Sequence, residues 1–187
     1  MDFSPVLSRP TVSPSLSENG KIMPYSTEME AAVLGAILID KEAFTRIKEL
    51  VRVKSFYGEA HQLIFAAMKA MFERSELIDL MTVTRHLRNQ NTIRKVGGTK
   101  YLAQLMGKVN SASNLEFHAL IISQLSLKRE MIGASEELMK EAFEESNDIF
   151  SVLDSTEQYF FKISEQSITK NYQNAGEIMR LTIDELE

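Results

Sequence analysis

No feature limits the possible folds of this chain more than the placement of its prolines. All four (Pro5, Pro10, Pro14 and Pro24) lie in the first 24 residues, and the remaining 163 residues contain none. A proline inside a helix removes a backbone hydrogen bond and clashes with the preceding turn, so the proline-free stretch permits long helices. Residues 1–24 mix proline with Ser, Thr and Asn, without an apolar pattern. They are predicted to form a disordered arm.

Beyond the arm, apolar residues recur at helical spacing and strand-like alternation is scarce. The segment from Ala31 to Leu38 is so densely apolar that it predicts a central helix, and Thr27 with Glu30 has the spacing of a capping box. A second helix is predicted to follow Asp40. Further helices are predicted at about 58–74, 82–89 and 98–107, with a glycine turn before the last. The fold class is therefore all-α, with a globular head of about five to six helices over residues 25–112.

Residues 113–168 are predicted to form a long antiparallel helical hairpin. A capping box at Ser113 and Glu116 opens a helix of about 114–145, which could reach about 45 Å at 1.5 Å per residue. After a break at residues 146–148, a second amphipathic helix follows. A two-helix unit cannot cover both sides of its apolar stripes, so we expect it to self-associate. The residues predicted for this role are Ile132, Met139, Phe143, Leu153 and Phe160; alternatively, some of them hold the hairpin's own helices together.

Residues 169–187 read as a polar linker followed by the start of another helix near Asn174. Met179, Ile183 and Leu186 stack on one side of this helix. A helix this short is marginal alone in water, so we expect it to be ordered only when docked on something outside its own fold. The chain stops inside the pattern, at Glu187, and we therefore expect the natural protein to continue.

Charge is divided between the two halves of the chain. Residues 1–115 carry 15 Lys/Arg against 11 Asp/Glu, or +4, whereas residues 116–187 carry 6 against 15, or −9. Between residues 81 and 108 there are six basic residues and no acidic one. A solvated surface is the simpler interpretation of this run; the alternative is a contact patch for single-stranded DNA or an acidic partner. The residues are Arg85, Arg88, Arg94, Lys95, Lys100 and Lys108.

Local patterns over residues 24–187 occur in an order and at spacings that are specific together. In chain order they are Pro24-Tyr25-Ser26 with Glu28 and Glu30, Ala32 to Leu38, Phe56-Tyr57 with His61 and Ile64-Phe65, Ile78 to Val83, Val96-Gly97-Gly98 with Tyr101-Leu102 and Leu105, Ser113-Asn114, Ile121-Ile122, Lys128-Arg129-Glu130, and Leu153-Asp154 with Glu157, Phe161 and Ile163. This order resembles the N-terminal domain of bacterial DnaB-type replicative DNA helicases. Leu77 and His118 depart from the family, which usually has proline and tyrosine there.

The resemblance implies a non-catalytic collar domain of a hexameric, ATP-dependent 5′–3′ DNA-unwinding ring. In this family the N-terminal domains pair through their hairpins, and the pairs form a trimer of dimers stacked on RecA-like motors. The implied partners are further copies of the chain, primase, a helicase loader, and DNA through the complete ring. The tail residues Met179, Ile183 and Leu186 would dock on a neighbouring motor. ATP and Mg²⁺ would belong to the motor, with no cofactor in this chain.

The motif that holds ATP phosphates, G-x-x-x-x-G-K-[ST], is absent, because Gly20-Lys21 is followed by Ile22 and Gly107-Lys108 by Val109. We therefore expect no ATPase or unwinding activity from these 187 residues. The segment from Val96 to Lys100 is predicted to be a helix-connecting turn rather than a phosphate loop. The ten methionines are interpreted as core filler.

Other catalytic or metal sites are not indicated. His61, His86 and His118 are far apart in sequence and are predicted to be packed or surface residues rather than metal ligands. The clustered carboxylates of Glu136, Glu137, Glu141, Glu144 and Glu145 are expected to cover a solvated helix face. There is no cysteine, no membrane-length apolar run and no secretory signal, which fits a cytoplasmic, non-membrane protein.

Two other classes of function stay open. One is a free-standing helical adaptor or regulator that dimerises through the hairpin, and the other is an enzyme with an unrecognised site. A longer reading frame with a glycine-rich phosphate loop after Glu187 would separate a helicase domain from an adaptor.

Overall fold

Helix α1 (Thr27–Ile39) is the central element, with eight of its thirteen residues buried. The predicted capping box at Thr27 is wrong. Ser26 is the N-cap instead: its extended backbone lets its side chain accept a hydrogen bond from the Met29 amide. Glu30 does not reach back to the cap, because its carboxylate is buried and bonded elsewhere in the head.

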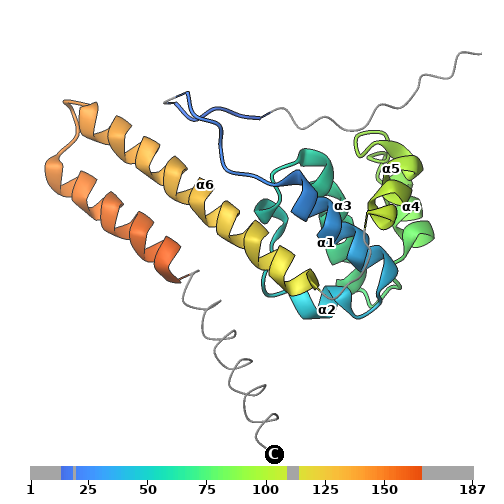
Figure 1. The fold of residues 1–187 in the computed structure, drawn as a ribbon. Helices are drawn as coiled ribbons and strands as arrows, with labels where there is room; N and C mark the ends of the chain where they lie inside the picture. Colours follow the sequence, from blue (N-terminus) through green and yellow to red (C-terminus); the bar gives the residue numbers. More distant parts are fainter. Residues whose placement is uncertain (1–13, 19, 109–113, 166–187) are drawn as a thin grey trace, which may run out of the picture. The chain divides into compact units, whose positions relative to one another are not determined.

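The computed structural model describes residues 14–18, 20–108 and 114–165 (Figure 1). After α1 come α2 (Ala43–Ile47), the 3₁₀ helix η1 (Val53–Ser55), α3 (Glu59–Glu73), α4 (Leu80–Asn89), α5 (Gly98–Gly107) and α6 (Leu115–Phe143), followed by a helix over residues 149–165. Within these ranges the only β-pairing is an isolated bridge between Leu16 and Ile22. The predicted all-α class is confirmed. The predicted linker helix of residues 169–187 lies outside the described residues.

The head is built around the two faces of α1. Helices α2, α3 and α5 pack on α1, α4 packs on α3 and α5, and η1 packs on α3. Aromatic rings fill the space between α2 and α3, where Phe44 lies 5.5 Å from Phe65 and 4.7 Å from Phe72 between ring centroids. Phe56 lies 4.7 Å from Phe65 on the other side. These contacts make one continuous apolar core.

The described residues divide into two compact units inside α6. One unit contains residues 22–108 and 114–126, and the other contains residues 127–165 with the described part of residues 17–21. The first three turns of α6 bury Leu115, Ala119 and Ile122 in the head. Arg46 of α2 also binds Glu116 at 3.2 Å. The sequence pattern runs unbroken through α6, because both units use the same apolar spacing.

The turns between head helices follow from local chemistry. Helix α2 is short and ends at Ile47, after which the Leu50 amide donates to the Ile47 carbonyl at 2.9 Å, three residues back. Asp40 accepts from the Glu42 amide at 2.9 Å but is not the N-cap of α2. Gly97 and Gly98 have φ of 83° and 73°, which side-chain-bearing residues rarely adopt, so the predicted glycine turn before α5 is confirmed.

Helix α4 begins at a reciprocal cap that gives a pH-dependent prediction. The Asp79 carboxylate accepts from the Thr82 amide at 2.8 Å, and Thr82 Oγ1 accepts from the Asp79 amide at 2.9 Å. The hydrogen bond from the Thr82 amide is the main cause that lowers the pKa of Asp79. The stability from the ionised cap is therefore present above the unfolded-state pKa of about 3.9 and is lost as pH falls through the lower folded-state value.

Asp79→Ala is expected to cost about 1 kcal/mol of unfolding free energy at pH 7, and this cost should shrink as pH falls below about 4. Asp79→Asn is the matched control, because it keeps an acceptor oxygen and has no charge to lose. Urea unfolding followed by circular dichroism at several pH values measures both. A cost for Asp79→Ala that stayed constant down to pH 2 would contradict the role of the ionised cap.

Residues 14–24 belong to the predicted disordered arm, yet they contain local hydrogen bonds. The amide of Ser17 donates to the Lys21 carbonyl at 2.8 Å, and Gly20 has a positive φ that allows this tight turn. Ser15 is hydrogen-bonded to the Tyr57 hydroxyl. Residues 1–13 lie outside the described part of the chain. Among the helices that the structure describes, none combines the length and the apolar character that crossing a membrane requires.

Candidate assembly and docking surfaces

The hairpin consists of residues 127–143 of α6 and the helix over residues 149–165, which run antiparallel (Figure 1). Asp148 opens the second helix, because its carboxylate accepts from the Phe150 amide at 3.2 Å. In the connection, the Asn147 side-chain amide donates to the Glu141 carbonyl at 3.0 Å. The predicted break at residues 146–148 and the antiparallel helix pair are therefore confirmed.

No side chain between residues 127 and 165 is buried. Five positions of the second helix are half-buried and lie on one face: Val152, Ser155, Thr156, Tyr159 and Ile163. This face provides the contact with α6. Each helix of the hairpin is covered on one face only, by the other helix. The hairpin therefore has no hydrophobic core that excludes water.

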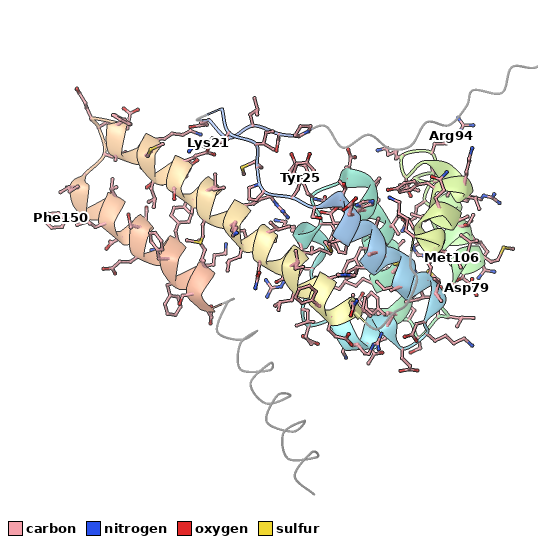
Figure 2. The ribbon with its side chains drawn as sticks, viewed as in Figure 1. Lys21, Tyr25, Asp79, Arg94, Met106 and Phe150 are labelled. Carbon is pink, nitrogen blue, oxygen red and sulfur yellow. The ribbon has the colours of Figure 1, made fainter. Side chains whose placement is uncertain are left out.

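Large apolar side chains outside that contact are open to solvent. The side chain of Phe143 is 84% exposed and that of Phe150, which extends from the first turn of the second helix (Figure 2), is 72% exposed. Ile149, Leu153 and Phe160 recur at spacings of four and seven, so they form a continuous stripe. We call the exposed set the hairpin apolar surface: Met131, Met139, Phe143, Ile149, Phe150, Leu153, Phe160 and Phe161.

Four of the five residues predicted for self-association belong to this surface. Met139, Phe143, Leu153 and Phe160 are between 43% and 84% exposed, whereas Ile132 is half-buried. The sequence did not single out Ile149, Phe150 and Phe161 for this role. Their spacing relative to Leu153 and Phe160 could have predicted that they belong to the same apolar surface. Whether the surface binds a second copy stays a prediction.

The carboxylates of the hairpin lie on a solvated surface, as the sequence indicated. Glu137, Glu144 and Glu145 are exposed, and Glu136 and Glu141 are half-buried. Lys140 is held between acidic groups, 2.7 Å from Glu18 and 3.8 Å from Glu137. The backbone amide of Glu18 also donates to Glu136 at 2.7 Å. The turn of residues 17–21 therefore belongs to the hairpin unit.

The six basic residues between positions 81 and 108 are all exposed in the head. We call them the basic face: Arg85 and Arg88 on α4, Arg94 and Lys95 in the turn that follows, and Lys100 and Lys108 on and just after α5. Figure 2 labels Arg94 in this turn. The Arg88 guanidinium donates to Thr99 Oγ1 at 3.5 Å, which brings α4 to the start of α5.

A buried polar network crosses the head and was missed at the sequence level. The Glu30 carboxylate, 1% exposed as a residue, lies 2.6 Å from His61 Nδ1 and accepts from the Tyr57 and Gly58 amides at 2.6 and 3.3 Å. His61 Nε2 lies 2.7 Å from the Tyr101 hydroxyl. The network joins α1, α3 and α5. The sequence did contain an indication that His61 is buried. It precedes the apolar Ile64 and Met68 by three and seven residues, which places it on the same face of α3.

The three histidines do not gather into one site. His61 is buried, His86 lies 3.3 Å from Arg74 and 2.9 Å from Gln90, and His118 contacts the Phe117 ring. In the described ranges no group of three or more His, Cys, Asp or Glu residues is arranged to hold a metal ion. The predicted tail contacts, Met179, Ile183 and Leu186, lie outside those ranges.

Comparison with known protein families identifies the family of the head. The family model for the DnaB-like helicase N-terminal domain matches residues 22–124, which cover the head up to the third turn of α6. The chain is 38% identical over 168 residues to the replicative DNA helicase DnaB of Rhodothermus marinus. That match covers 90% of this chain and 18% of the relative. Curated relatives are matched over only 17–37% of their own length.

Solved structures show the same fold. The crystal structure of the N-terminal domain of DnaB helicase from Mycobacterium tuberculosis matches with a TM-score of 0.71 and 28% identity, over 74% of this chain and 98% of that chain. A structure described as a DnaB-like replicative helicase and its interactions with primase matches with a TM-score of 0.63, over 74% of this chain and 30% of that chain. At 20% identity, the second match shows the fold alone.

Proposed function

Because the chain belongs to the family of DnaB-like helicase N-terminal domains, we propose that it is the assembly collar of a replicative DNA helicase. In this role it self-associates through its hairpin and binds other replication proteins. It carries no catalytic step itself. Unwinding, with ATP and Mg²⁺, belongs to a motor domain elsewhere in the complete protein, which we expect to work in the cytoplasm.

The observation that carries the proposal is the hairpin apolar surface. A hairpin of 39 residues without one buried side chain exposes eight large apolar side chains, two of them phenylalanines more than 70% exposed. Pairing two hairpins would bury these side chains in a four-helix arrangement. Removing about 800 Å² of apolar surface from water contributes roughly 20 kcal/mol gross at 25 cal/mol per Å², and lost rigid-body freedom offsets much of it.

The further partners follow from the family rather than from any contact in this chain. We propose that hairpin pairs assemble as a trimer of dimers in a hexamer, and that the collar binds primase and a helicase loader. The tail residues Met179, Ile183 and Leu186 would dock on a motor domain. A free-standing adaptor that dimerises would use the same hairpin, so the assembly test below applies to it as well.

Phe143→Asp is expected to convert the associated protein into a monomer at tens of micromolar, because it places a charge at the most exposed apolar side chain of the hairpin. Light scattering coupled to gel filtration measures the mass. Phe117→Asp is the matched control: it changes a phenylalanine that is 63% exposed on the same helix, but within the head unit. Added salt should tighten the parent dimer, because residues 116–187 repel each other with a charge of −9.

Two outcomes would contradict this assignment. A parent chain that stays monomeric at tens of micromolar would show that the hairpin does not self-associate. A folded Phe143→Asp variant that associates as strongly as Phe117→Asp would move the interface away from the hairpin tip.

A further inference from the structure

We propose that the basic face of the head binds the phosphodiester backbone of DNA. The inference rests on the proposed function, because it assumes that the collar works beside DNA. It adds a contact surface on a part of the chain that has no motor machinery. The contact is independent of base sequence and is separate from the hairpin apolar surface.

The cations of the basic face have no acidic partners. No carboxylate in the described part of the chain lies within 4.0 Å of any of the six cationic groups. The single hydrogen bond that their side chains make within the described residues is that of Arg88 to Thr99. Three other exposed cations, by contrast, are paired: Lys69 with Glu73, Arg74 with Glu76, and Lys140 with Glu18. The basic face therefore keeps its full positive potential toward solvent.

The cations follow a path along the surface rather than scattering over the head. Arg85 and Arg88 are three residues apart on α4 and share its exposed side. The bond from Arg88 to Thr99 places that side next to the first turn of α5, where Lys100 lies. Lys108 ends α5, eight residues and about 12 Å farther along the helix axis. A flexible phosphate backbone can follow such a row.

The surroundings favour a nucleic acid over an acidic protein. Between residues 81 and 108 a single large apolar side chain is exposed, that of Met81, one turn before Arg85 on α4. A protein partner needs apolar or aromatic anchors at the centre of its contact, whereas phosphates are held by charges and hydrogen bonds alone. The hydroxyl of the only aromatic residue in the run, Tyr101, is bonded to His61. Bases are therefore left without a stacking platform, which predicts binding without sequence preference.

Binding should be weak and strongly dependent on salt, because the whole chain carries −5. Each phosphate neutralised on a single strand contributes about −0.7 to the slope of log affinity against log salt. Three to four phosphate contacts predict a slope between about −2 and −3. Affinity should then fall on the order of twenty- to sixtyfold between 50 and 200 mM salt.

The test uses the 187-residue chain and a fluorescein-labelled 20-nucleotide oligothymidylate, followed by anisotropy at 50 mM salt. The triple variant Arg85→Glu, Arg88→Glu, Lys100→Glu is expected to lose at least tenfold in affinity. The triple variant Lys21→Glu, Lys69→Glu, Lys128→Glu changes net charge by the same amount at exposed sites outside the basic face. It should bind more tightly than the first variant. A duplex of equal length in a second arm shows whether single or double strands supply the phosphates.

Equal affinity losses in both triple variants would overturn the inference, because net charge alone would then explain them. Displacement of the oligonucleotide by polyglutamate as effectively as by unlabelled oligothymidylate would assign the face to acidic polypeptides instead. Absence of binding by the parent at 50 mM salt would also overturn it. None of these results would contradict the proposed assembly. The first triple variant keeps the whole hairpin, and light scattering measures the mass of that variant separately.

Discussion

Replacing Glu30 with alanine is expected to lower the free energy of unfolding by about 3–5 kcal/mol, because it removes the acceptor shared by three buried donors. The Glu30 carboxylate accepts from the Tyr57 and Gly58 amides and lies 2.6 Å from His61 Nδ1, so all three groups lose their partner together. Glu30 is 1% and His61 2% exposed, so both side chains are shielded from bulk water in the folded head. The substitution would weaken the packing of the first turn of α3 on α1. It would also weaken the packing of α5, whose Tyr101 hydroxyl is bonded to His61.

Urea unfolding monitored by circular dichroism measures this change. Glu28→Ala is the matched control, because Glu28 lies in the same first turn of α1 but is exposed, and it should change stability by less than about 1 kcal/mol. Glu30→Gln should recover part of the loss by keeping an acceptor oxygen. Equal midpoints for Glu30→Ala and Glu28→Ala would show that the network contributes nothing to the fold.

Phe65→Ala is expected to cost a similar 3–5 kcal/mol, through an emptied volume rather than a broken hydrogen bond. The ring is 1% exposed and lies between Phe44 and Phe56, at centroid distances of 5.5 and 4.7 Å. Its removal leaves those rings without a contact on one side, and the close-packed helices α2 and α3 cannot collapse fully into the space. The melting temperature should fall by roughly 10 °C.

Differential scanning calorimetry provides the measurement, and Phe117→Ala provides the control. Phe117 is 63% exposed within the head unit, so its truncation removes the same atoms without opening a cavity. Phe65→Leu should fall between the parent and Phe65→Ala. A melting temperature for Phe65→Ala within about 2 °C of the Phe117→Ala value would contradict the placement of this ring in the core.

The elements best predicted from the sequence are those whose ends have local causes. Helix α3 lies within the predicted 58–74 and α5 spans the predicted 98–107, because a glycine precedes each and the apolar spacing between is regular. Family membership was also predictable, because short local patterns keep their order along the chain.

What the sequence could not give depends on contacts between distant residues. Glu30 has the spacing of a helix-capping residue, and only the packing of α3 against α1 turns it toward His61, 31 positions away. The division of α6 at residue 126 is equally hidden. Apolar side chains recur at the same spacing along the whole helix. Several of those before residue 126 pack in the head, and none after it is buried.

Because no side chain of the hairpin is buried, the stability of the hairpin should depend on the concentration of whatever binds it. The head has a closed core, so its melting should be the same in dilute and in concentrated samples. The hairpin gains stability only from what covers it, and a ligand that binds only the folded form raises stability with its concentration. If that ligand is a second copy, the abundance of the protein itself sets how much of the hairpin is folded. Dilution would then loosen the hairpin and leave the head intact.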